Sequence, residues 1–119
     1  MDIWTSLGAF AFFESERLSF RPLIFLDRFD LHEIVSNPKN LQFFFPATQT
    51  QHETDCLLVH YFMKEPLGVW AIVDKELEKM IGVVRFEKID VQKRTAELGY
   101  FLNASYWGRG LMKIGRAHV

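Results

Sequence analysis

The chain has 119 residues, of which 49% are apolar and 24% charged, and its formal net charge at pH 7 is −1. This composition is typical of a globular domain and excludes a disordered tail, a collagen-like repeat and a disulfide scaffold. Because there is no surplus of basic residues, we expect neither a nucleic-acid partner nor binding to an anionic membrane. The single cysteine, Cys56, is interpreted as a buried apolar residue and fits a cytoplasmic location.

The first third of the chain predicts an arm, a strand and a helix. Residues 1–13 are mixed and apolar, and we expect them to form a short arm packed on the domain. Residues 17–21 alternate polar and apolar side chains, which predicts a strand. Residues 28–36 predict a helix with Asp27 as its N-cap, because a carboxylate there can accept from the free N–H groups of the first turn. Pro38 is expected to end this helix.

An aromatic connector, residues 41–46, follows and shows neither a helical nor a strand period. Its three consecutive phenylalanines, Phe43, Phe44 and Phe45, allow two interpretations. They either fill the core or form one wall of a pocket for an acceptor substrate. Both interpretations stay open at this point, and the three side chains are kept as candidate substrate-binding residues.

The rest of the chain predicts a second helix and three strands. Thr50 and Glu53 match a capping box, and the helix that they begin continues to about Lys64. Three apolar stretches joined by short polar turns then predict an antiparallel meander, with strands over 69–73, 80–88 and 96–102. This element order predicts an α+β fold in which a mixed sheet contains the antiparallel meander and two helices pack on it.

Other polar residues have simpler interpretations. The histidines on the predicted helices lack metal-ligand spacing, so no metal site is predicted; they are His32, His52 and His60. The basic residues near one hairpin are interpreted as a solvated face balanced by acidic neighbours; they are Arg85, Lys88, Lys93 and Arg94.

The last predicted strand runs into a turn with two glycines, Trp107-Gly108-Arg109-Gly110-Leu111-Met112. Such a turn presents successive backbone N–H groups at the start of a helix, a combination that binds phosphate or pyrophosphate. The spacing does not fit a dinucleotide-binding Gly-x-Gly-x-x-Gly turn, because residue 113 is a lysine, and no Walker A sequence follows.

Together, the strand and the turn, residues 96–112, resemble the acetyl-CoA motif of the GNAT family of N-acetyltransferases. That motif is commonly written Gln/Arg-x-x-Gly-x-Gly/Ala, and the version found here is similar to the branch that acetylates ribosomal proteins. Segments 16–23 and 80–82 resemble the opening strand and the third strand of the same branch. The resemblance covers residues 14–113 and implies the N-terminal half of a GNAT fold.

The resemblance implies acetyl transfer from acetyl-CoA to a primary amine, either a protein N-terminus or a small molecule. It implies that the pantetheine arm pairs with the backbone of Phe101, Leu102 and Asn103. It also implies that the pyrophosphate is held by the glycine turn, that is, by Gly108, Arg109, Gly110, Leu111 and Met112.

The acceptor arrives as an ammonium group and must lose a proton before it can attack a thioester, which calls for a carboxylate base or a chain of waters. Glu97, on the fourth strand of the family pattern, is the first candidate for this base, and Glu87 is the second. For each of them the alternative interpretation is an ordinary surface glutamate that is exposed, hydrogen-bonded or ion-paired.

The expected organisation is an arm over residues 1–13, a partial N-acetyltransferase domain over 14–113 and a non-native tail over 114–119. The six tail residues equal one reading frame of a common sequencing-adapter stretch. We expect a chain cut after the acetyl-CoA motif to be inactive and its parent to be an enzyme, with homodimerisation left open. The rival interpretation is a non-catalytic module that binds an acyl-CoA or a protein partner.

Overall fold

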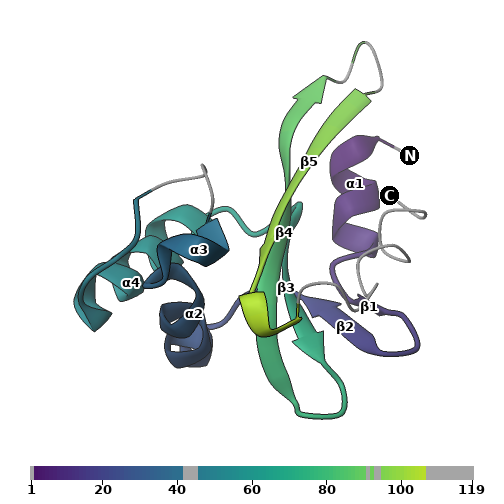
Figure 1. Ribbon diagram of the computed structural model, residues 1–119. Helices are drawn as coiled ribbons and strands as arrows, with labels where there is room; N and C mark the ends of the chain where they lie inside the picture. The colour runs from purple at the N-terminus through teal and green to yellow at the C-terminus, as the bar shows by residue number, and fades with distance from the viewer. Residues whose placement is uncertain (1, 42–45, 91, 93–94, 107–119) are drawn as a thin grey trace.

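The computed structural model describes residues 2–41, 46–90, 92 and 95–106. Its centre is a five-stranded sheet whose spatial order follows the sequence (Figure 1). The strands are β1 (Phe13–Glu14), β2 (Leu18–Arg21), β3 (Val69–Asp74), β4 (Lys79–Asp90) and β5 (Thr95–Leu102). All neighbouring strands described are antiparallel, which confirms the predicted meander and the α+β class. Within the described residues, β5 forms one edge of the sheet.

Helices cover both faces of this sheet (Figure 1). The helices are α1 (Ile3–Ala9), α2 (Arg28–Val35), α3 (Pro38–Leu41) and α4 (Gln51–Leu57). One face carries α2, α3 and α4, and the other carries the N-terminal helix α1. Helix α4 continues without a break into a π-helical turn, Leu58–Met63, and short 3₁₀ turns lie at Phe25–Asp27 and Ala104–Tyr106.

Successive side chains along each strand point to opposite faces of the sheet, and this produces two separate apolar cores, one on each face. The first core lies under the helices that follow β2 and includes Leu31, Ile34, Leu58, Phe62, Val83 and Phe101. The second core lies under α1 and includes Leu7, Phe20, Trp70, Ile81, Leu102 and Tyr106. Strand β5 contributes to both cores, so its last residues are fixed from two sides.

The predicted N-terminal arm contains a helix and the start of the first strand. Asp2 caps α1, since its Oδ1 accepts from Thr5 N at 2.8 Å. Leu7 of α1 is buried in the second core. The ring of Phe13 stacks on that of Phe20 at 4.5 Å between centroids, and Trp70 Nε1 donates to the carbonyl of Phe10 at 3.1 Å. This segment therefore covers the second face of the sheet.

The prediction that the Asp27 side chain caps α2 is wrong. Asp27 has φ −69° and ψ −6°, which are helical values, whereas a capping residue needs extended backbone to aim its side chain at the first turn. Its buried carboxylate instead accepts two hydrogen bonds from the Arg21 guanidinium, at 2.8 and 2.9 Å. It also accepts from Ile24 N at 2.8 Å. Asp27 thus fixes the link between β2 and α2.

The second predicted helix begins as expected, because Thr50 Oγ1 accepts from Glu53 N at 3.1 Å. The prediction that Cys56 is buried is wrong, since this thiol is exposed. The side of the helix that faces the core carries Thr54, Leu58 and Phe62, which lie four residues apart. Cys56 falls outside this stripe. The buried position on this turn of the helix is occupied by a polar residue, Thr54.

A pH dependence of stability is expected from the ion pair between Arg28 on α2 and Asp55 on α4. The two hydrogen bonds, of 2.9 and 2.5 Å, lower the pKa of Asp55 from its ordinary 3.8 to about 2. Because the folded pKa is the lower one, this contribution is present above about pH 4 and disappears towards pH 2. We expect the urea midpoint to fall over this range and to fall less for Asp55→Asn. An equal fall in both proteins would contradict the assignment.

Candidate functional site

The two candidate base residues, Glu97 and Glu87, lie at the same point along the β4–β5 pair. Glu97 is exposed and stands opposite Lys88 in the register. The register shifts between Phe86 and Lys88, so Glu87 is the extra residue of a β-bulge. Bulges of this kind redirect side chains and are frequent next to active sites. The structure describes the place of Glu87 on β4 but not its side chain.

The end of β5 is firmly anchored. Phe101 is buried in the first core and Leu102 in the second. Asn103 N donates to Ile81 O at 2.7 Å, and Asn103 O accepts from Tyr106 N at 2.9 Å. Both backbone groups of Asn103 are therefore engaged within the protein, and this residue shapes the exit of the strand.

A buried asparagine that the sequence analysis did not single out also fixes the chain where it leaves β5. Asn40, on α3, accepts from Ala104 N through Oδ1 at 2.6 Å and donates to Ile34 O through Nδ2 at 2.9 Å. It therefore ties α2 and α3 to the residues that follow β5. An asparagine two residues after a proline looks like an ordinary turn residue in the sequence, so no local signal distinguishes this one.

The remaining predicted site residues cannot be placed. The aromatic connector residues Phe43, Phe44 and Phe45 lie outside the described residues, as does the whole glycine turn with Gly108, Arg109, Gly110, Leu111 and Met112. Their assignments remain predictions. Among the described residues, no group of three or more metal-ligating side chains comes together, and no helix is long and apolar enough to span a membrane.

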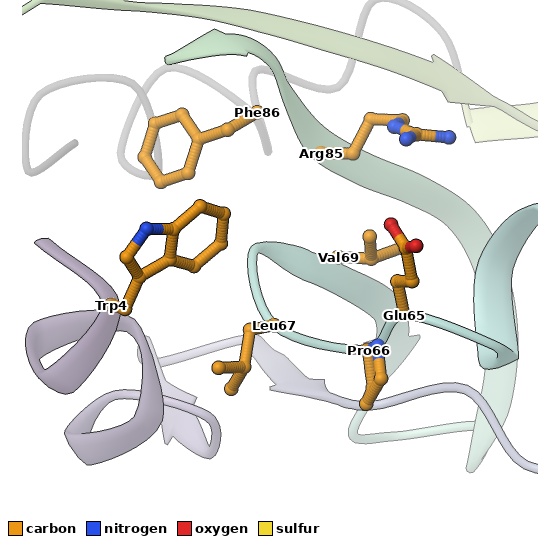
Figure 2. Close-up of a pocket in the computed structure, with 7 residues that line it drawn as sticks. All are labelled: Trp4, Glu65, Pro66, Leu67, Val69, Arg85 and Phe86. Carbon is orange, nitrogen blue, oxygen red and sulfur yellow. The ribbon is translucent and has the colours of Figure 1, made fainter. Parts of the chain in front are cut away.

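A pocket of about 560 Å³ lies where the chain enters β3 (Figure 2). Trp4 and Phe86 form one side of it, and Glu65 and Arg85 stand on the other (Figure 2). Pro66, Leu67 and Val69 complete the lining. The pocket therefore combines an apolar wall with two side chains of opposite charge.

Arg85 does not belong to a solvated face as its sequence neighbours suggested. It is half-buried, and its guanidinium carbon lies 4.6 Å from the centre of the Tyr61 ring. Nη1 donates to Tyr61 O over a long 3.4 Å, and the buried Nε has no hydrogen-bond partner. A buried donor left without a partner costs about 1–3 kcal/mol, so its presence calls for an explanation.

Comparison with known proteins gives the family. Residues 17–115, well over half of the chain, match the family described as acetyltransferase (GNAT) domain. The uncharacterized N-acetyltransferase p20 of Bacillus licheniformis is 27% identical over 100 residues, which cover 81% of this chain and 56% of that protein.

Two solved structures share the fold. The ribosomal-protein-S5-alanine acetyltransferase of Vibrio fischeri is similar with a TM-score of 0.60 and 22% identity, over 88% of this chain and 62% of that one. The spermidine N-acetyltransferase of Vibrio cholerae, in complex with CoA and spermine, is similar with a TM-score of 0.65 and 20% identity, over 87% and 62%. The chain thus spans less than two thirds of the length of these relatives. By its match over residues 17–115, the chain belongs to the GNAT acetyltransferase domain family.

Proposed function

We propose that the protein containing this chain transfers an acetyl group from acetyl-CoA to a primary amine. Family membership over residues 17–115 is the observation that carries the proposal. Relatives with this fold include an enzyme named for a ribosomal protein and one named for spermidine, and the latter was solved with CoA. A protein N-terminus and a small amine therefore both remain acceptor classes, with the ribosomal-protein type favoured by the sequence motif.

In this proposal the pantetheine arm of acetyl-CoA runs along the end of β5 at Phe101 and Leu102. The edge position of β5 within the described residues supports this placement, because an edge strand can accept an extended ligand as an added strand. The glycine turn, residues 108–112, is assigned to the pyrophosphate. The connector phenylalanines, residues 43–45, are assigned to one wall of the acceptor site.

Glu97 is proposed as the general base, and Glu87 is the second candidate. The base takes a proton from the acceptor ammonium, and the neutral nitrogen then attacks the thioester carbonyl carbon. As the new C–N bond forms and the C–S bond breaks, the nitrogen loses a second proton, and the departing CoA thiolate takes up one proton to become the thiol. The exposed position of Glu97 on β5 supports this role, since the base must meet an acceptor that comes from solvent.

The test is Glu97→Gln in the full protein, assayed by release of the CoA thiol with a panel of amines. We expect kcat at neutral pH to fall by about 10²- to 10⁴-fold, as for loss of a general base, while the KM for acetyl-CoA changes little. Glu76→Gln is the matched control, because Glu76 is an exposed glutamate in the turn between β3 and β4. This control should keep full activity.

Two outcomes would count against the proposal in different ways. Full activity of Glu97→Gln would remove Glu97 as the base, and Glu87→Gln would then be assayed in the same way. Binding of acetyl-CoA by the wild-type protein without acetylation of any amine would favour the non-catalytic acyl-CoA-binding module.

A further inference from the structure

We propose that the pocket at Arg85 binds the carboxylate of the acceptor, and that the acceptor therefore carries both an amine and a carboxylate, as an amino acid or an acidic peptide does. This inference rests on the acetyltransferase function proposed above. It adds the chemical class of the acceptor and names Arg85 as the residue that selects it.

Arg85 lies in the row of the sheet that leads to Glu97. Val69, Arg85 and Gly99 stand opposite one another on β3, β4 and β5, so they share one face of the sheet. Glu97 is two residues from Gly99 along β5 and belongs to the same face. Gly99 has no side chain and therefore places nothing between Arg85 and Glu97 on this face. Arg85 and the proposed base are therefore diagonal neighbours on this face.

The guanidinium of Arg85 is held in place but is not neutralised. Tyr61 supplies both the aromatic ring against which it stacks and the carbonyl that accepts its long hydrogen bond. Among the described residues, no carboxylate forms an ion pair with Arg85 within 4.0 Å. A planar guanidinium fixed in this way is suited to bind a carboxylate by donating two parallel hydrogen bonds to it.

The residue that holds Arg85 belongs to an unusual turn. Tyr61 lies in the π-helical turn Leu58–Met63, in which Lys64 N donates to Val59 O at 2.9 Å. Such turns are rare and occur frequently at functional sites. This turn is a second observation, separate from the pocket, that points to the same place.

The charge of the pocket selects among anionic ligands. Glu65 lines the pocket together with Arg85, and its carboxylate points towards the side where Arg85 stands (Figure 2). Glu65 would repel a phosphate dianion more strongly than a carboxylate, which carries a single charge. Trp4, Leu67 and Phe86 can contact an apolar side chain of the same ligand.

The test compares acceptors that differ only in the carboxylate. Methionine and methioninamide are each offered as acceptors to the wild-type full protein, to Arg85→Gln and to Arg85→Lys, and the acetylation rates are compared. We expect Arg85→Gln to lower kcat/KM for methionine about ten- to hundredfold, as for loss of a charged hydrogen bond, and to leave methioninamide unchanged. Arg85→Lys keeps the charge but loses the bidentate geometry and should be intermediate. Arg17→Gln, at an exposed arginine, is the control and should change neither rate.

Two peptide substrates distinguish a peptide acceptor from an amino-acid acceptor. Ala-Asp-Ala-amide carries its carboxylate only on the second residue, and Ala-Asn-Ala-amide lacks it. A selective loss with the aspartate peptide identifies a peptide acceptor, and a selective loss with methionine identifies an amino acid. Equal losses on every probe, or no loss on any, would overturn the role of Arg85.

A binding measurement separates failure of this inference from failure of the proposed function. N-acetylmethionine is titrated into the protein while the Arg85 Nε–H resonance is followed by NMR, with N-acetylmethioninamide as the reference. A shift with the first compound alone supports the pocket even if no amine is acetylated, in which case only the proposed function fails. If neither compound moves the resonance in a protein that acetylates amines, the inference fails and the function stands.

Discussion

Replacing Gly82 by alanine is expected to displace strand β5 and to destabilise the fold by about 3 kcal/mol or more. A Cβ at this position would collide with the carbonyl oxygen of Phe101, and it would lie 2.7 Å from Leu102 Cδ2 and 3.2 Å from Leu102 Cα. Two of these three neighbours are backbone atoms of a strand that is buried on both faces, so they cannot be relieved by a change of rotamer. The site assigned to acetyl-CoA should therefore lose its geometry together with its stability.

The measurement is urea unfolding of Gly82→Ala together with the affinity for CoA by calorimetry. Gly8→Ala is the matched control, because the nearest atom to a Cβ at position 8 is Leu67 Cδ2, at 4.0 Å. An alanine in helix α1 is expected to be neutral or to stabilise the fold by up to about 1 kcal/mol. A Gly82→Ala protein with unchanged stability and unchanged CoA affinity would show that β5 can shift without consequence.

The hairpins of the sheet could be predicted from the sequence because their signals are local. Each consists of an apolar strand, a short polar turn and another apolar strand, and the observed strands β3 to β5 lie within about two residues of the predicted ends. Helix α4 was found for the same reason, since the threonine that caps it and the glutamate three residues later are close in sequence.

The features that were missed depend on contacts between separate elements of the structure. Asp27 looked like a helix cap, but its partner Arg21 lies on the preceding strand and binds both carboxylate oxygens. Arg85 looked solvated because the sequence around it is charged. Its environment is set instead by Tyr61, which stands 24 residues earlier. The place of Glu97 on β5 was predicted correctly, whereas the pocket at Arg85 arises only from packing.

Removal of the Asp27 carboxylate, by Asp27→Ala, is expected to destabilise the protein by about 3 kcal/mol or more. Asp27 is 3% exposed and its carboxylate neutralises Arg21, whose pKa is raised by the hydrogen bonds that the guanidinium donates to Asp27. The substitution would leave the Arg21 guanidinium without its counter-charge in a partly buried position. Ile24 N would lose its acceptor as well, and the turn that starts α2 would lose its anchor on β2.

Urea unfolding followed by tryptophan fluorescence, to which the buried Trp70 contributes, measures this effect. Glu14→Gln is the control, because the pair of Glu14 with Lys75, at 3.3 Å, lies on an edge of the sheet with the glutamate 69% exposed. Ion pairs of that kind contribute about 0–1 kcal/mol, since water already solvates both charges. If both substitutions had the same small effect, Arg21 would have to be satisfied by solvent. The link from β2 to α2 would then be held by the apolar residues around it, and the buried ion pair would have no structural role.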